Sequence, residues 1–333
     1  MLNLDDLKII RKYDRGNMLD TIETFAAQCR DAKNIGYRFD LPGSFITRYR
    51  NIVCTGLGGS AIGSDIARAY IADEAKTPIF VNRNYRLPDF VGVETLVIAS
   101  SYSGNTEETI SAYKDAKARG AKIVAITSGG ELRKLASGGG FPVLTIPKGF
   151  QPRCALGYSF FPLLIVLSKI GIIKGQTSNI DEVIEDLKTL NVNRIGAGVP
   201  EKKNIAKRIA KLLYNKFPVI YAGQDHMDCV VTRWRGQISE NAKTLSSGHV
   251  FPEMNHNEIM GWEDPAELLK DFVALILRDS GDNPRIAKRM DITKKIIVKA
   301  GVKVIEVDSI GSSLLSRMFS LIYIGDFVSF YLA

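Results

Sequence analysis

The sequence predicts an α/β protein with two domains, each built around a parallel sheet with helices on both faces. Apolar runs of strand length alternate with helical segments along most of the chain, which is the pattern of βαβ units. Several of these runs lead directly into glycine-rich or hydroxyl-rich turns, and ligands of such sheets bind beyond the C-terminal ends of the strands. The length of 333 residues corresponds to about two domains.

The strands and helices of the first half can be placed from apolar runs and turn residues. Strands are predicted at Asn51–Thr55, Pro78–Val81, Thr95–Ala99, Lys122–Thr127 and Pro142–Ile146. Helices are predicted at about Met1–Arg30, Asp65–Ala72, Ile110–Arg119 and Glu131–Ala136.

The second half repeats this alternation without a clear sequence repeat. A long apolar helix at 155–170 links the halves, so the domains are expected at residues 1–150 and 151–333. The segments that follow are helices at Asp181–Leu190, Pro200–Tyr214, Asp228–Lys243 and Asn283–Val298, strands at Pro218–Gly223, Asp271–Leu277 and Lys303–Val307, and a terminal helix.

The composition indicates a globular protein and argues against a nucleic-acid-binding one. The apolar content of 45% and charged content of 24% are those of an ordinary globular protein. The formal charge of +8 comes from scattered lysines and arginines, without the basic and aromatic pattern of a nucleic-acid-binding protein. A phosphorylated substrate is enough to rationalise the positive balance.

The cysteines and the chain ends indicate a cytoplasmic protein. The N-terminus lacks the basic start and apolar run of a signal peptide. The most apolar segment, 314–333, is interrupted by Arg317 and Asp326, which favours a buried or interface helix over a membrane span. Four widely spaced cysteines indicate reduced thiols: Cys29, Cys54, Cys154 and Cys229.

The turn SYSGNTEET, residues 101–109, carries the strongest functional signal of the first half. It follows the strand Thr95–Ala99 and leads into a helix, with Asn105 and Glu108 as a predicted capping pair. A helix N-terminus presents unpaired N–H groups and the positive end of the dipole, which suits a phosphate. Such a turn is more often structural, so the phosphate interpretation needs support from elsewhere.

A glycine-rich loop, GLGGSAIG at residues 56–63, follows the first strand. It partly fits a dinucleotide-binding fingerprint, which requires an acidic residue at the end of the next strand. That strand ends in Asn82 and Arg83, and although Arg83 would suit a 2′-phosphate, dinucleotide binding ranks below sugar-phosphate binding. Both this loop and the 101–109 turn follow strand C-termini, so they can converge on one ligand.

Three residues further along could each have a role in the site or be simple surface residues. Arg153, beside a proline at a helix entrance, is either a surface residue or a cation over the site. Glu240 reads as a solvated helix carboxylate, and His256 as a polar loop residue that can also exchange protons near neutral pH. A metal site of His249, His256 and Glu258 matches none of the common spacings, so no metal is predicted.

Five motifs in order make the sequence resemble a known family. They are GLGGSAIG (56–63), SYSGNTEET (101–109), PRCALGY (152–158), QISENAK (237–243) and PEMNHNEI (252–259). Their order is similar to that in the archaeal-type bifunctional phosphoglucose/phosphomannose isomerases of the phosphoglucose isomerase superfamily. The resemblance runs from about Ile52 to the C-terminus and implies two SIS (sugar isomerase) domains of flavodoxin-like, three-layer αβα fold.

The resemblance implies an aldose–ketose isomerase that interconverts glucose 6-phosphate, and mannose 6-phosphate, with fructose 6-phosphate. The reaction would pass through a cis-enediolate without metal, nucleotide or other cofactor. Glu240 would be the base, Arg153 would stabilise the enediolate, and His256 would help open the ring from the partner subunit of a homodimer. The phosphate would be held by Gly59, Ser60, Ser101, Ser103 and Thr106.

Three alternatives stay open. Members of that family usually continue past the position of Ala333 with a turn that carries a residue linked to accepting mannose 6-phosphate, and with a helix that carries a ring-opening lysine, so dual substrate specificity is an open expectation. A SIS module that senses a phosphosugar would need the phosphate cradle without a base, and an isomerase could act on another phosphosugar. A nicotinamide-dependent enzyme ranks last, since it depends on the glycine loop alone.

Overall fold

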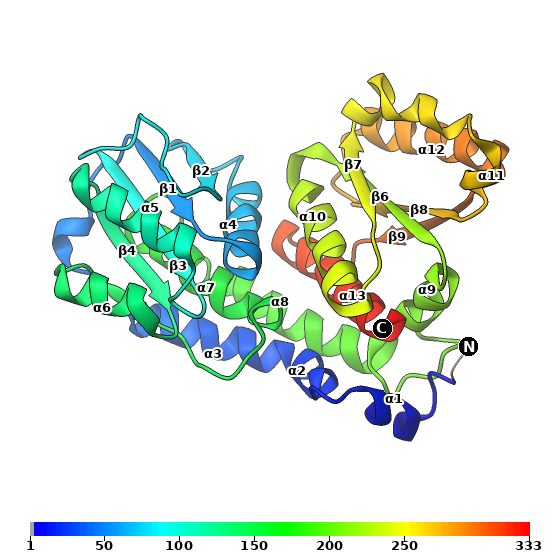
Figure 1. The fold of residues 1–333 in the computed structure, drawn as a ribbon, viewed down its shortest axis with the longest axis horizontal. Helices are drawn as coiled ribbons and strands as arrows, with labels where there is room; N and C mark the ends of the chain where they lie inside the picture. Colours follow the sequence, from blue (N-terminus) through cyan, green and yellow to red (C-terminus); the bar gives the residue numbers. More distant parts are fainter. Residues whose placement is uncertain (1–2) are drawn as a thin grey trace. The chain divides into compact units, whose positions relative to one another are not determined.

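The computed structural model describes residues 3–333, which form two compact units. The first unit contains residues 25–181, and the second contains residues 3–24 and 182–333. Each unit has one parallel sheet between layers of helices (Figure 1), so the predicted α/β class with parallel sheets is confirmed. The boundary at residue 150 stays a prediction; the compact units divide the chain at other points.

The sheet of the first unit has the strand order β2-β1-β3-β4-β5, with every neighbouring pair parallel. Its central strand, β3, is buried along its whole length, because helices cover both faces of a parallel sheet. This explains why the strands read as continuous apolar runs. They are β1 (Asn51–Thr55), β2 (Ile79–Asn82), β3 (Thr95–Ser101), β4 (Lys122–Thr127) and β5 (Val143–Thr145).

Two helical layers enclose this sheet (Figure 1). Helices α5 (Glu107–Ala118) and α6 (Gly130–Gly138) pack on one face through a cluster that includes Val97 and Ile123. Helices α3 (Phe25–Arg38), α4 (Gly58–Tyr70) and α7 (Leu156–Lys169) form the other layer, accompanied by the short helices η1 (Gly43–Phe45) and η2 (Pro152–Cys154). Helix α8 (Thr177–Leu190) begins in this unit, and its residues from 182 on belong to the second unit.

Helix α4 begins seven residues before the predicted start at Asp65. The segment expected as a glycine loop is therefore largely helical. Glycine is a poor helix former, but here it allows close packing, since a Cβ on Gly63 would lie 2.6 Å from Ser159 Oγ on α7. Tertiary packing against α7 thus overrides the low helix propensity of this stretch.

The sheet of the second unit has the order β7-β6-β8-β9 and is also parallel. Its strands are β6 (Phe217–Gly223), β7 (Ser247–Phe251), β8 (Phe272–Arg278) and β9 (Lys303–Asp308). Sequence reasoning missed β7, because this edge strand is only half buried over its first four residues and lacks a long apolar run.

Helices cover both faces of the second sheet as well (Figure 1). Helix α12 (Pro284–Lys299) packs on one face with the short segments η4 (Glu253–His256), η5 (Glu258–Trp262) and α11 (Ala266–Leu269). On the other face, helices α9 (Ile205–Leu213) and α10 (Gln224–Ala242) both pack against α13 (Leu314–Leu332).

The N-terminal segment is not the single helix predicted over residues 1–30, of which Met1 and Leu2 lie outside the described residues. It forms α1 (Leu7–Tyr13) and α2 (Met18–Glu23) before α3 begins. Asp14 separates the first two by accepting hydrogen bonds from the amides of Met18 and Leu19, at 2.8 Å each. Asp14 is also the C-cap residue of α1, so the same residue ends the first helix and binds the first amides of the second.

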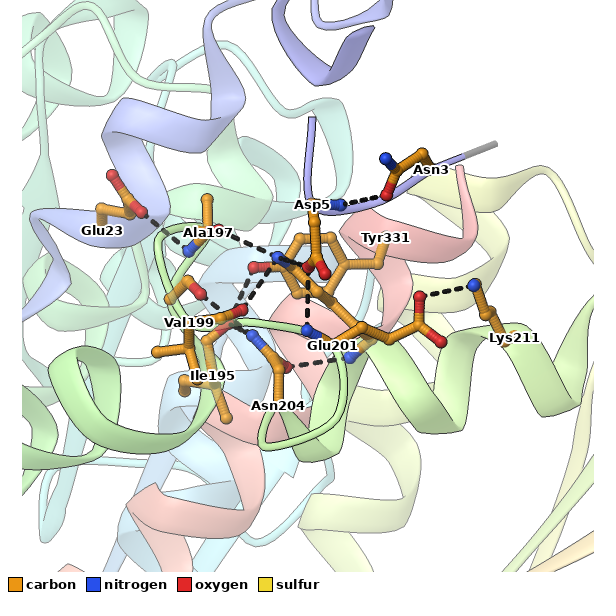
Figure 2. Close-up of polar contacts among 12 residues, drawn as sticks. Asn3, Asp5, Glu23, Ile195, Ala197, Val199, Glu201, Asn204, Lys211 and Tyr331 are labelled. Atoms are coloured by element: carbon orange, nitrogen blue, oxygen red, sulfur yellow. Dashed lines mark hydrogen bonds and ion pairs between the residues drawn. The ribbon is translucent and has the colours of Figure 1, made fainter. Parts of the chain in front are cut away.

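A group of polar contacts around Asp5 holds the N-terminal segment within the second unit (Figure 2). Lys207 on α9 is fully buried, and its ammonium donates to Asp5 at 3.0 Å and to the carbonyls of Ala197 and Val199 at 2.9 Å each. The same nitrogen lies 5.7 Å from the ring centroid of Tyr331 on α13. A buried charge is tolerated when it is paired and fully hydrogen-bonded in this way.

The apolar C-terminal segment forms α13, which packs against α10. Its Asp326 is buried and pairs with Arg233 through two hydrogen bonds of 2.9 and 3.1 Å, while Gln237 donates to it at 2.9 Å. The carboxylate that interrupts the apolar sequence is thus satisfied inside the unit. Over residues 3–333, none of the helices combines the length and apolar character needed to cross a membrane.

Candidate functional site

A hydroxyl-rich turn connects β3 to α5 in the first unit. Ser101 Oγ and Thr106 Oγ1 lie 2.9 Å apart and close the turn, while the amide of Gly104 donates to Ser101 Oγ at 3.1 Å. Ser103 is exposed and accepts from the amide of Asn105 at 3.2 Å. Three hydroxyl groups therefore gather within six residues at the carboxyl edge of the sheet, where ligands bind in open parallel sheets.

The turn has room for no side chain at its centre. Gly104 has a φ of +73°, and a Cβ on it would lie 1.8 Å from the carbonyl oxygen of Gly129. Glycine adopts this left-handed conformation without steric strain. Gly104 is therefore required for the turn to pack against the segment that follows β4.

The N-terminus of α5 differs from the predicted capping pair of Asn105 and Glu108. Thr106 is the N-cap residue, and within residues 3–333 its side chain makes no capping hydrogen bond. Asn105 Oδ1 instead accepts from the amide of Glu131, at 3.0 Å. This side chain is therefore used elsewhere, and the first-turn amides lie at the end of α5 where the helix dipole is positive.

The glycine-rich segment meets this turn. Gly59 and Ser60 lie in the first turn of α4, and Ser60 Oγ accepts from the amide of Tyr102 at 3.1 Å. The two segments that were expected to converge from separate strands are therefore in direct contact. They bring together two helix N-termini, an arrangement that favours an anion.

Arg153 lies beside this pair of segments. A Cβ on Gly59 would be 2.5 Å from the carbonyl oxygen of Pro152 and 3.3 Å from the amide nitrogen of Arg153, so only glycine lets η2 approach α4 this closely. The Arg153 side chain is half-buried. The structure thus brings together six of the predicted site residues in one unit: Gly59, Ser60, Ser101, Ser103, Thr106 and Arg153.

The remaining two predicted residues belong to the other unit. Glu240 is exposed on the last turn of α10, and His256 is exposed at the end of η4. Helix α10 is held to α13 by the Arg233–Asp326 pair and by Asn241, which donates to Ser329 Oγ at 2.9 Å. The carboxylate of Glu240 is therefore carried by a helix with a fixed orientation inside its own unit.

The structure weakens two alternatives raised by the sequence. Arg83, which was considered for a 2′-phosphate, forms an ion pair with Asp65 on α4. Glu258 of the conceivable metal set accepts from the Tyr221 hydroxyl at 2.5 Å, and His249 Nδ1 accepts from the Val250 amide at 2.8 Å. Across residues 3–333, no group of three or more potential metal ligands is assembled.

Sequence reasoning missed one residue of the site, Tyr102. Its hydroxyl accepts from the amide of Phe150 at 2.8 Å, across 48 positions of the sequence. Burial raises the pKa of Tyr102 above its ordinary value, and the Phe150 N–H opposes this shift. Its position inside the 101–109 motif was the only available signal, and nothing in the motif indicates where the hydroxyl points.

Two family descriptions match the chain. Residues 45–136 match the SIS domain, and residues 202–333 match the bacterial phospho-glucose isomerase C-terminal SIS domain. The first match includes the cradle of hydroxyl groups, and the second includes Glu240 and His256.

Individual proteins of related sequence and fold agree with these matches. A bifunctional phosphoglucose/phosphomannose isomerase of Caldicellulosiruptor bescii is 52% identical over 85% of this chain and 83% of its own. One of Aquifex aeolicus is 39% identical over 86% of this chain and 85% of its own. The C-terminal domain of glucosamine-fructose-6-phosphate aminotransferase from Francisella tularensis has a similar fold, with a TM-score of 0.71 at 15% identity over 95% of each chain.

Proposed function

The chain belongs to the family of bifunctional phosphoglucose/phosphomannose isomerases, and from this premise we propose that it interconverts glucose 6-phosphate and mannose 6-phosphate with fructose 6-phosphate. One observation carries the proposal most directly. The SYSGNTEET turn and the first turn of α4 meet through the Tyr102–Ser60 hydrogen bond, and in the described part of the chain the Thr106 side chain does not cap α5.

The phosphate of the substrate would be held by neutral groups. Ser60, Ser101, Ser103 and Thr106 offer hydroxyl donors, and the N-termini of α4 and α5 offer backbone amides and favourable dipoles. When the phosphate dianion is held this way, the reacting carbons of the sugar are also held at a defined distance from the cradle. Such fixation contributes to catalysis by lowering the entropic cost of reaching the transition state.

The proton chemistry would be divided among three residues. The carboxylate of Glu240 would remove the proton from C2 of the aldose and return it to C1, while a second proton moves from the C2 hydroxyl to the oxygen on C1, which produces the ketose. Arg153 would stabilise the negative charge that develops on the enediolate oxygen, and this stabilisation is greatest in the transition state. His256 would transfer a proton to the ring oxygen when the cyclic sugar opens.

The assembly and location are further parts of this proposal. A homodimer would allow His256 to be contributed by the partner subunit, and a cytoplasmic enzyme would keep its four cysteines reduced. The structure has four free cysteines, of which Cys29, Cys54 and Cys229 are buried.

A coupled assay tests the proposed reaction. Fructose 6-phosphate is supplied to the purified protein, and glucose 6-phosphate and mannose 6-phosphate are measured separately, with and without a chelator. We expect both products, at rates that the chelator does not change. Saturable binding of fructose 6-phosphate without turnover would favour a phosphosugar sensor, and the absence of binding would contradict the proposal.

A further inference from the structure

Tyr102 contacts three other segments of the first unit. Its amide donates to Ser60 Oγ at 3.1 Å, and its carbonyl oxygen accepts from the amide and the hydroxyl of Ser128, at 3.1 and 2.7 Å. Its own hydroxyl accepts from the amide of Phe150 at 2.8 Å. The residue therefore connects the segments that follow β1, β4 and β5 to the turn that follows β3.

These contacts separate by chemistry into two groups. The main-chain groups of Tyr102 hold Ser60, which belongs to the proposed phosphate cradle, and Ser128, which follows β4. The phenolic hydroxyl holds the segment that leads to Arg153, in which the Phe150 ring also packs against Tyr158. A change from tyrosine to phenylalanine removes the second contact and keeps the first group, so the two roles can be tested apart.

Only two residues separate Phe150 from Arg153, and a hydrogen-bonded turn joins this segment to Arg153. The amide of Cys154 donates to the carbonyl of Gln151 at 2.8 Å, which forms the single turn of η2 that contains Arg153. The other side of this turn lies against Gly59. The start of η2 is thus held by the Tyr102 hydroxyl and by close packing on the α4 backbone, and its end by Gln28, which donates to the carbonyl oxygen of Cys154 at 2.8 Å.

We propose that Tyr102 is a positioning residue for Arg153: its hydroxyl fixes the segment 150–153 so that the guanidinium is held over the substrate bound in the cradle. The inference rests on the proposed function, in which Arg153 stabilises the enediolate. Because displacement of a stabilising group by about 1 Å can slow a reaction by up to roughly 100-fold, one hydrogen bond at the start of η2 is sufficient to matter.

The first test is Tyr102→Phe, measured against Tyr113→Phe. Tyr113 is a matched control, since its hydroxyl donates to a backbone carbonyl, that of Leu135, at 2.9 Å, in the same unit. We expect kcat of Tyr102→Phe to fall by about 10- to 100-fold, with KM and the inhibition constant of inorganic phosphate within about twofold of the wild type. The control keeps the wild-type kcat.

The second test is the same substitution in an Arg153→Ala background. If Tyr102 acts through Arg153, its substitution has no further effect on kcat there, because interacting positions are not additive. A general structural role would instead lower kcat by the same factor in both backgrounds, and that result would overturn the inference.

A third measurement does not depend on activity. Hydrogen exchange of the amides at 150–154 is expected to be at least about tenfold faster in Tyr102→Phe, with exchange at 103–109 unchanged. Unchanged exchange at 150–154 would overturn the inference even if the enzyme were inactive. An inactive wild-type protein with the expected exchange pattern would contradict the proposed function and leave the positioning contact supported.

Discussion

The turns that follow β3 and β8 occupy matching places in the two units, but they differ in their charge and in how the next helix begins. The sheet orders β2-β1-β3-β4-β5 and β7-β6-β8-β9 align β3 with β8. Each strand leads through a short turn into a helix, α5 in the first unit and α12 in the second. The topology therefore creates the same kind of ligand-binding edge twice.

The turn after β8 already contains negative charge. Asp279 accepts from the Arg317 Nε and from the hydroxyl of Ser309, at 2.7 Å each. Asp282 accepts from the amide of Asp279 at 3.0 Å, and a Cβ on Gly223 would lie 2.8 Å from Asp282 Oδ1. A carboxylate thus fills the corner between β6 and β8.

The N-terminus of α12, the helix that follows, also has few free N–H groups to offer an anion. Asn283 caps α12 by accepting from the amide of Arg285 at 2.9 Å, and Pro284 occupies the first turn and has no N–H. In the first unit, the corresponding turn has hydroxyl groups, and among residues 3–333 the Thr106 side chain does not cap α5. The comparison teaches that topology supplies the position, whereas the side chains decide which of the two positions is suited to a phosphate.

The second unit contributes other groups to the proposed reaction, and this gives the largest expected effect. Glu240→Gln should lower kcat by about 10²- to 10⁴-fold, the usual contribution of a general base, while KM changes little. The coupled isomerase assay measures both constants. The control is Glu267→Gln at an exposed site of the same unit; an equal loss in both variants would contradict the assignment.

The glycines of the two turns should differ in their tolerance of a side chain. Gly104→Ala requires a left-handed alanine and a collision with backbone, so we expect a loss of about 3 kcal/mol or more of unfolding free energy. Gly281→Ala in the second turn meets only the ends of the Arg317 and Asp279 side chains and should cost less. Urea denaturation of both variants measures the difference; equal losses would show that the first turn is not specially constrained.

The serines of the two turns should differ in substrate binding. Ser103→Ala removes a proposed donor to the phosphate, and a hydrogen bond to a charged group is worth about 1.5–3 kcal/mol, so KM should rise roughly 10- to 100-fold. Ser280→Ala removes a hydroxyl from an equally exposed site of the second turn and should leave KM unchanged. If KM rises for Ser280→Ala instead, the two turns have been assigned the wrong way round.

The smallest effect concerns Asp282, the half-buried acid of the second turn. Burial raises the pKa of Asp282 above its ordinary value of 3.8, and the charges of Asp279 and Asp225 raise it further. Because the folded-state pKa is raised, this group's contribution to stability is present below the unfolded pKa and is lost as pH rises through the folded pKa.

Asp282→Asn should therefore be more stable than the wild type at pH 7, by on the order of 1 kcal/mol or less. The difference should shrink as pH falls towards 4. Denaturation at several pH values measures it, with Asp308→Asn at the exposed end of β9 as the control. A variant that is less stable than the wild type at pH 7 would show that the carboxylate is required in this turn.

Sequence reasoning reached the fold and the parts of the cradle that depend on local patterns. Apolar runs placed β1 and β4 at their observed limits, since buried parallel strands are uniformly apolar. It failed where tertiary packing decided the outcome. Helix α4 starts at Gly58 because α7 packs against it, and Asn105 binds Glu131 on α6 in place of capping α5.

The same limit applies to the site. Ser101 and Arg153 could be singled out from motifs, whereas the hydroxyl contact from Tyr102 to Phe150 joins segments whose proximity only the folded chain defines. The closure of the second turn by Asp282 was likewise outside the reach of the sequence. The sequence around a loop carboxylate does not show whether the side chain is solvated or fills the place of a ligand.

A crystal structure of the full chain with bound fructose 6-phosphate would test the central claim most directly. We expect one phosphate per chain, within hydrogen-bond distance of the hydroxyls of Ser101, Ser103 and Thr106, and none at the turn Asp279–Asn283. Phosphate at the second turn, or a sugar phosphate bound away from the SYSGNTEET turn, would contradict the account.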